Sequence, residues 1–142
     1  MTPGQIYRHS HFYTGNDGSP RPKFFLILAI GQDGDVINRL LTSGSTGTIR
    51  PEQPPCFHGD PYPGFFLGVL GGRLGTKSWL DLRGLDDFDA DLLALGIRRG
   101  NLTLETTLTG TVFRDALLCA AAANDTSRRQ ENAIRNEATK IP

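Results

Sequence analysis

The sequence predicts an α+β fold: a small antiparallel β-barrel followed by C-terminal helices, in a single domain that spans residues 1–142. The chain has 142 residues, which is the length of one domain. Hydrophobic residues make up 38% and charged residues 21%, so the composition is that of a globular protein. Glycines and prolines divide much of the chain into short strand-like runs, and two helical patterns follow. We therefore expect the barrel over about residues 3–108 and the C-terminal helices over about residues 109–139.

The first three strands are predicted from alternation and from apolar runs. Residues 5–13 alternate and contain β-forming side chains, which indicates a strand. Residues 15–22 (GNDGSPRP) are typical of a loop. The continuous apolar run at residues 23–30 predicts a central strand that is covered on both faces. The hairpin signal GQDG at residues 31–34 joins it to a partner strand at residues 35–42.

A long irregular segment separates these strands from the next two. Residues 43–64 contain five prolines, and a loop of this length inside a compact domain is usually functional or mobile. Residues 65–70 and 78–82 predict two further strands around a glycine-rich turn at residues 71–75. Gly68 within the first of them indicates a bend or bulge, as a barrel needs at its corners.

Helical patterns dominate the rest of the chain. The predicted elements are a helix at residues 86–95, a short strand at residues 102–104, a helix at residues 111–123 and a polar helix at residues 126–138. Acidic residues occupy the first turn of the first helix, and Gly96 follows its expected end. Thr109 is a candidate N-cap for the second helix. The last helix has few apolar residues, so we expect it on the surface.

Charge and hydropathy exclude several classes of protein. Fifteen basic and fifteen acidic residues give a formal net charge of zero, which argues against binding duplex nucleic acid by bulk charge. No run approaches the roughly 18 apolar residues of a membrane span, and the N-terminus lacks the apolar core of a signal peptide. We expect a cytoplasmic protein with no membrane partner. In that compartment Cys56 and Cys119 are expected as free thiols, although one bridge is possible.

Two features at strand ends have the chemistry to bind phosphate. Arg21 precedes Pro22, which favours extended backbone at Arg21 and holds its guanidinium at the rim of the sheet. A guanidinium there can bind a phosphate through two hydrogen bonds. Thr42 and Ser43 end the third predicted strand, where a hydroxyl can donate to a phosphate oxygen. The alternative roles are a solvated turn arginine and hydroxyls that cap the chain.

Taken together, these pieces resemble the PemK/MazF family of toxin endoribonucleases, from type II toxin–antitoxin systems. The family opens with a Pro-Gly-x-Ile/Val-Tyr/Trp strand, which residues 3–7 (PGQIY) match. Its Arg-Pro before an apolar strand is similar to residues 21–28, and its strand ending in Thr-Ser is similar to residues 40–43. Residues 78–81 (SWLD) match a later Ser-x-apolar-Asp strand. The order and spacing of these motifs carry the resemblance over roughly residues 3–82.

The resemblance implies an SH3-like barrel of the CcdB/MazF type, a homodimer and metal-independent cleavage of single-stranded RNA. The family's catalytic Arg maps onto Arg21 and its catalytic Thr onto Thr42. Arg21 would stabilise the charged transition state and Thr42 would position the scissile phosphate, with the 2′-hydroxyl of the RNA as nucleophile. Lys23 and Ser43 beside them are the expected substrate-binding residues. The expected protein partner is an antitoxin whose disordered tail blocks the groove.

The first predicted strand supplies a second set of candidates. Tyr7, His9, His11 and Tyr13 share one face of an extended strand, because side chains alternate along it. We expect His9 or His11 to assist proton transfer beside Arg21. The two tyrosines are candidates for stacking on RNA bases. The alternative is an edge strand whose tyrosines pack on the barrel.

The motif Cys56-x-His58-x-Asp60 contains three residue types that bind metals. A structural zinc site needs four ligands in characteristic pairs, and neither CxxC nor HxxxH occurs in the sequence. We therefore expect no metal and no cofactor, and interpret the motif as part of a proline-ordered loop over the barrel mouth. Residues 44–64, which contain it, have no counterpart in the family pattern.

A function without catalysis remains an alternative. A barrel of the same shape can bind a protein target such as gyrase, bind nucleic acid without cleaving it, or join a larger assembly through its polar C-terminal helix. The net charge of zero and residues 44–64, the additional segment relative to the family pattern, favour these functions. The pairs Arg21-Pro22 and Thr42-Ser43 favour the endoribonuclease.

Overall fold

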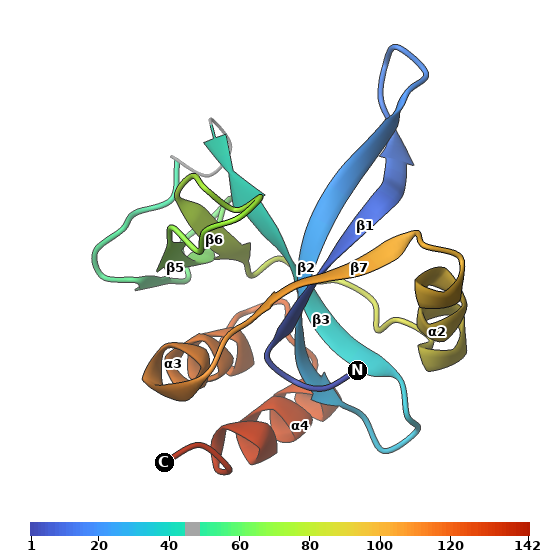
Figure 1. Cartoon of the computed structure of the whole chain (residues 1–142). Helices are drawn as coiled ribbons and strands as arrows, with labels where there is room; N and C mark the ends of the chain where they lie inside the picture. The colour runs from blue at the N-terminus through green and yellow to red at the C-terminus, as the bar shows by residue number, and fades with distance from the viewer. Residues whose placement is uncertain (45–48) are drawn as a thin grey trace.

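The computed structural model describes residues 1–44 and 49–142, and its architecture is α+β (Figure 1). The strands are β1 (Gln5–Thr14), β2 (Pro20–Ile30), β3 (Val36–Ser43), β4 (Cys56–Phe57), β5 (Gly64–Gly68), β6 (Ser78–Asp81) and β7 (Leu102–Thr107). They form one antiparallel sheet in the order β4-β5-β6-β3-β2-β1-β7. The helices are α2 (Ala90–Arg98), α3 (Gly110–Ala121) and α4 (Arg128–Ala138). The predicted α+β class with an antiparallel sheet is confirmed.

The sheet is open in the part of the chain that is described. Strand β4 lies at one edge and β7 at the other, and they do not pair with each other. Strand pairing therefore does not close the sheet into a barrel. No helix between residues 1–44 or 49–142 is long and apolar enough to cross a membrane.

The first hairpin is tighter than the sequence suggests. β2 begins at Pro20, within the predicted loop at residues 15–22. The connection between β1 and β2 is therefore a short turn, in which the Gly15 amide donates a hydrogen bond to the Ser19 carbonyl at 2.8 Å. Pro20 lies opposite Thr14 at the first position of the strand, where a residue without an N–H is tolerated. The predicted turn at residues 31–34 is confirmed, since the Gly31 amide donates to the Asp35 carbonyl.

Helix α2 begins and ends later than predicted. The Asp89 side chain accepts hydrogen bonds from the amides of Asp91 and Leu92, and this N-cap sets the start of the helix at Ala90. Gly96 lies within the helix rather than after it. A Cβ at Gly96 would come within 3.0 Å of the Leu102 side chain, so glycine lets α2 pack closely on β7.

Helix α4 lies on the surface, as expected, and buries one face. Its capping box of Ser127 and Gln130 closes the first turn. Ile134 is fully buried and Ala138 nearly so, because one narrow apolar face of this polar helix packs against α3 and β2. Few apolar residues were enough to anchor this face.

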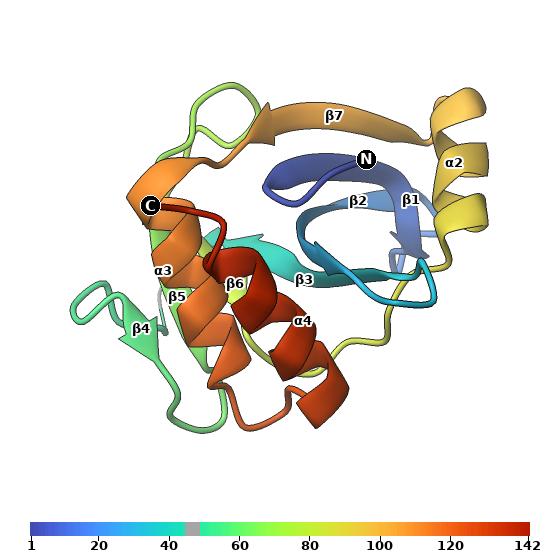
Figure 2. The same cartoon turned by 90° about the horizontal axis from the view of Figure 1, so that it is seen from below.

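The apolar run of β2 is covered on both faces, as predicted. Helices α3 and α4 cover one face, with a core that contains Ile6, Leu26 and Leu117. On the other face, Phe25 and Leu93 belong to a smaller core beside α2. Figure 2 shows α3 and α4 together on one side of the sheet and α2 apart from them. Alternate residues of the central strands therefore belong to different cores.

The additional segment is tied to the sheet by a buried ion pair. The Arg50 side chain is fully buried, and its Nη2 lies 3.3 Å from Oδ1 of Asp81. Burial raises the pKa of Asp81, but hydrogen bonds from Arg83 and the charge of Arg50 outweigh burial and hold that pKa below its usual value. Both guanidinium groups lie over the ring of Tyr62. Residues 45–48 of the predicted loop at residues 44–64 lie outside the described part of the chain.

A second buried arginine connects the sheet to α4. Arg39 of β3 is fully buried, and its guanidinium donates to Thr126 Oγ1, to Gln130 Oε1 and to the carbonyls of Asn38 and Leu85. Burial lowers the pKa of Arg39. One cationic side chain therefore satisfies acceptors from three separate segments.

We expect Arg39→Ala to lower the free energy of unfolding by about 3 kcal/mol, because it opens a cavity and leaves buried acceptors without a donor. Chemical denaturation followed by circular dichroism measures this. Arg128→Ala, at an exposed position of α4, is the matched control and should change stability by less than about 0.5 kcal/mol. Equal effects of the two substitutions would contradict the role given to Arg39.

Candidate functional site

Arg21 and Thr42 lie at the same end of the sheet. β2 and β3 are antiparallel, so the start of β2, which contains Arg21, and the end of β3, which contains Thr42 and Ser43, point the same way. The ladder between the two strands ends at the pair of Phe25 and Leu40. Beyond that pair β2 stays with β1 while β3 pairs with β6, and the strands diverge (Figure 1).

The strand register assigns most of the predicted site residues to one face. Alternation places Arg21, Lys23 and Phe25 on the same face of β2. Residues directly opposite each other in an antiparallel pair project to the same side. The printed pairs therefore extend this face to Tyr7 opposite Phe25, His9 opposite Lys23, Tyr13 opposite Arg21, and Leu40 with its alternate neighbour Thr42. Ser43 falls on the opposite face.

The exposed fractions separate the two predicted catalytic residues. The Arg21 side chain is 45% exposed and its Nη2 lies 3.2 Å from Oδ2 of Asp17. A hydrogen bond from the Ser19 hydroxyl holds the pKa of Asp17 below its usual value. Solvent screens this ion pair, so a phosphate can compete for the guanidinium. Thr42 is only 8% exposed, beside Trp79 of β6.

The two tyrosines have different surroundings. Tyr7 is 7% exposed and stacks on Phe25, with ring centroids 6.0 Å apart. Burial raises the pKa of Tyr7. It is therefore a core residue and offers no open ring face to an RNA base, which corrects its predicted substrate-binding role. Tyr13 is 51% exposed and keeps a surface for stacking.

The two histidines of β1 are neighbours at an irregular part of the strand. The register of β1 against β2 shifts between His9 and Tyr13, and His11 lies in this interval. The His11 amide donates to Nδ1 of His9 at 3.2 Å. Burial lowers the pKa of His9, and the nearby charge of His11 lowers it further. Neutral His9 therefore persists below pH 6.5 and is able to accept a proton.

A cavity of about 530 Å³ adjoins His9. Phe12 of β1 and Leu92 of α2 contribute apolar walls, and Arg99 and Asn101 contribute polar groups. Sequence reasoning missed this cavity because it depends on α2 packing against β1 and β7.

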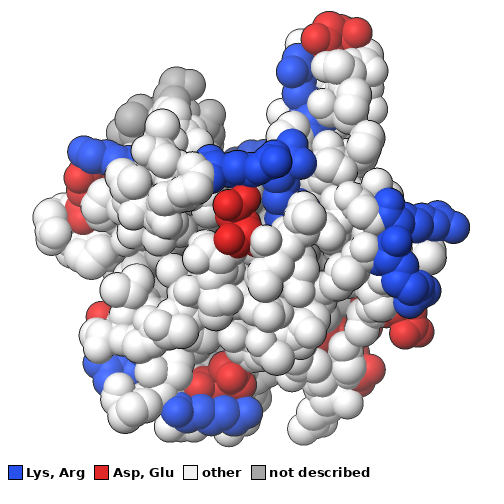
Figure 3. All heavy atoms as spheres, in the orientation of Figure 1, with Lys and Arg blue, Asp and Glu red and all other residues white. Residues whose placement is uncertain are grey.

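Basic side chains are concentrated near this end of the sheet, although the net charge is zero. Figure 3 shows Lys and Arg side chains along the hairpin of β1 and β2 and on the surface between that hairpin and β6. Acidic side chains lie beside them, at the tip of the hairpin and below the basic band. Ion pairs of Arg21 with Asp17, Arg73 with Glu105 and Lys77 with Glu52 offset part of the basic charge. Solvent screens the exposed pair of Arg21, so its guanidinium can still bind an anionic ligand.

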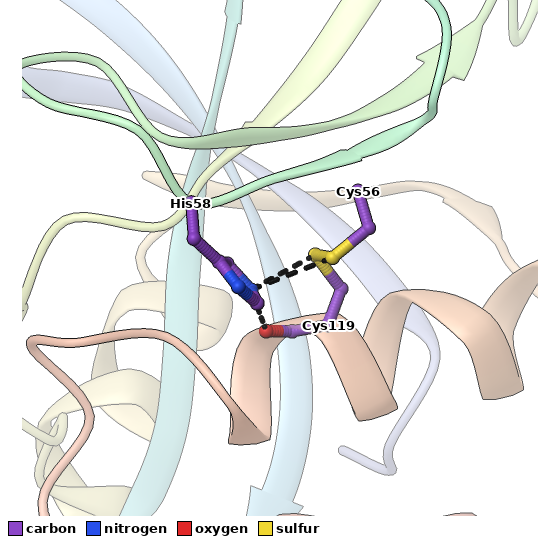
Figure 4. Close-up of side chains that lie close together, drawn as sticks. All are labelled: Cys56, His58 and Cys119. Carbon is purple, nitrogen blue, oxygen red and sulfur yellow. Dashed lines mark hydrogen bonds between the residues drawn. A yellow bond between two sulfur atoms is a disulfide. The ribbon is translucent and has the colours of Figure 1, made fainter.

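The Cys56 motif has a different neighbourhood from the one expected. Cys56 and Cys119 form a disulfide, so the expectation of two free thiols is wrong in this structure. The reason is that β4 and the last turn of α3 bring their Cα atoms to 5.7 Å although they are 63 positions apart in the sequence. His58 lies against the bridge (Figure 4). Asp60 lines a small cavity beside His58.

We expect NMR titration of the His9 ring to give a pKa below 6.5, and His11→Gln to raise it by removing the neighbouring charge. Just below pH 6.5 the unfolded state then binds more protons than the folded state. The contribution of His9 therefore makes the free energy of unfolding decrease as the pH falls through that window. The decrease levels off below the pKa of His9 in the folded state. His9→Gln identifies the resonance. A His9 pKa at or above 6.5 would contradict this assignment.

Comparison with known proteins identifies no family for this chain. No family model matches it, and neither a curated protein nor a solved structure does. Its function is therefore inferred from the residues and the geometry described above.

Proposed function

We propose that the protein is an endoribonuclease of the toxin type, which cleaves single-stranded RNA without a metal ion in the cytoplasm and is neutralised by an antitoxin. The observation that carries the proposal is the placement of Arg21, Lys23 and Thr42 on one face of the sheet, where β2 and β3 diverge. A guanidinium, an ammonium and a hydroxyl at one end of the sheet are the groups that bind a phosphodiester. The basic surface around the hairpin supports the same ligand (Figure 3).

In the proposed reaction the 2′-hydroxyl of the RNA attacks the adjacent phosphorus and the bond to the 5′-oxygen breaks, leaving a cyclic phosphate. His9 accepts the proton of the 2′-hydroxyl at Nδ1, since its pKa is lowered and its ring is neutral near pH 7. The hydrogen bond from the His11 amide to this nitrogen is released when the RNA binds. Arg21 stabilises the charge that develops on the phosphate oxygens, and Thr42 donates a hydrogen bond that positions the phosphate. His11 supplies the proton that the leaving 5′-oxygen takes up.

We also propose that the sheet is related to the SH3-like barrel and that the protein assembles with a second copy of itself. The sheet would be an opened variant of an SH3-like barrel, with β1, β2, β3 and β6 carrying the motifs that resemble the PemK/MazF family. The functional unit would be a homodimer. The antitoxin would bind across the face that contains Arg21, as a disordered segment that becomes ordered on the basic surface.

A second candidate is a module that binds a protein or nucleic acid without cleaving it. The low exposure of Thr42 and the ion pair of Arg21 with Asp17 favour it, because neither group is fully available in this conformation. A cleavage assay separates the two functions.

We expect the parent protein to cut a long single-stranded RNA in EDTA, and Arg21→Ala to slow cleavage by about 100- to 1,000-fold, the usual effect of removing one donor to a transition state. Thr42→Val removes the hydroxyl at nearly constant volume and should have a similar effect. Thr42→Ser keeps the hydroxyl and should stay within about tenfold of the parent. Gel electrophoresis of the RNA products measures the rates.

Arg114→Ala is the matched control, since Arg114 lies on α3, which covers the other face of the sheet. It should cut RNA at the parent rate. Absence of RNA cleavage by the parent protein would exclude the nuclease function and favour the binding module. Cutting that survives both Arg21→Ala and Thr42→Val would place the active site elsewhere.

A further inference from the structure

We propose that Cys56, His58 and Cys119 form a zinc site when the two cysteines are reduced. The same three residues then have two states, a disulfide and a metal centre. The ligands come from two segments far apart in the sequence: Cys56 and His58 from β4 and the residue after it, and Cys119 from the last turn of α3. Figure 4 shows the imidazole of His58 directed toward the two sulfur atoms.

The distances from His58 fit a tetrahedral metal. Its Nε2 lies 3.4 Å from Sγ of Cys56 and 3.5 Å from Sγ of Cys119. With Zn–S near 2.3 Å and Zn–N near 2.0 Å, tetrahedral geometry requires a nitrogen–sulfur separation of about 3.5 Å. The imidazole therefore needs little movement to become a ligand. The two sulfur atoms must separate to about 3.8 Å by the same geometry.

A purely structural role for His58 explains only part of this arrangement. Nε2 of His58 lies 2.9 Å from the carbonyl oxygen of Cys119, and a carbonyl only accepts, so the imidazole donates this bond. Carbonyls in the last turn of a helix lack partners within the helix, and the bond caps one of them. Capping requires contact with the carbonyl alone. It does not require the same nitrogen to lie at matched distances from both sulfur atoms.

A cavity beside His58 has room for a solvent molecule that could be the fourth ligand. This cavity has a volume of about 270 Å³ and is also lined by Asp60, Arg83 and Asp125. Among the residues described, the ligand atoms that lie within 4.8 Å of one another here are those of Cys56, His58 and Cys119. We therefore assign three protein ligands and a water molecule to the metal, and leave Asp60 outside the ligand set.

The conversion balances with a phosphine as the reductant. The phosphine and one water molecule reduce the disulfide to two thiols, and the phosphine is oxidised to its oxide. Zn²⁺ then displaces the two thiol protons. Nε2 of His58 gives up its proton as Nδ1 takes one, so the bond to the Cys119 carbonyl is exchanged for a bond to zinc.

The experiment measures zinc in the full-length protein before and after reduction with a phosphine under anaerobic conditions. We expect the reduced protein to retain one zinc per chain after desalting, and the oxidised protein to retain none. Cobalt provides a second readout, because thiolate ligands give an intense charge-transfer absorption that other ligands do not. Cys56→Ser, Cys119→Ser and His58→Gln should each weaken metal binding at least tenfold.

Asp60→Asn is the matched control: it removes a potential ligand two residues after His58 and should leave zinc binding unchanged. Circular dichroism of each reduced variant separates loss of a ligand from loss of the fold. Less than about one zinc per ten reduced parent chains, or parent-like binding by folded His58→Gln, would overturn the proposal. Loss of zinc in folded Asp60→Asn would overturn the assigned ligand set. The nuclease assay in EDTA is independent of all these outcomes.

Discussion

The pairing of β2 with β3 is the interaction on which the rest of the structure depends. Both strands are buried on both faces, so their alternate side chains belong to two different cores. Helices α3 and α4 complete the larger core and α2 covers the smaller one. Arg39, fully buried in β3, ties the sheet to α4 with hydrogen bonds rather than apolar contact. A one-residue slip of this pair would exchange the two cores and bury the wrong side chains.

The same pairing also explains where the candidate site lies. It ends at Phe25 and Leu40, and from there the two strands follow different partners. Side chains that continue the buried face, Arg21 and Thr42 among them, then reach a region that α2, α3 and α4 do not cover. On this face of the strands Phe25 is apolar and buried, whereas Arg21 and Thr42 are polar. Polar groups that continue an apolar face beyond the end of its core are typical of a ligand site.

Local sequence signals predicted the strands and turns that local chemistry determines. The apolar run of β2, the GQDG turn and the start of β3 follow from nearby residues alone. Three features depended on distant residues and were not predictable: the extension of α2 past Gly96 toward Leu102, the burial of Ile134, and the approach of Cys119 to Cys56. In the candidate site, too, some features follow from nearby residues and others depend on distant ones. Strand register brings Arg21 and Lys23 to one face of β2, whereas Tyr7 is buried in the core.

The two proposed sites make opposite demands on the chain. An RNA site needs an exposed guanidinium and a hairpin free to adapt, and Arg21 is held only by a solvent-screened ion pair with Asp17. The proposed zinc site of Cys56, His58 and Cys119 needs a rigid segment instead. The buried ion pair of Arg50 and Asp81 and the disulfide to α3 hold that segment against the rest of the fold. Either state of that site, disulfide or zinc, joins residues 63 positions apart and restricts the unfolded chain. A cell compartment that reduces disulfides would therefore retain this cross-link only where a metal replaces it.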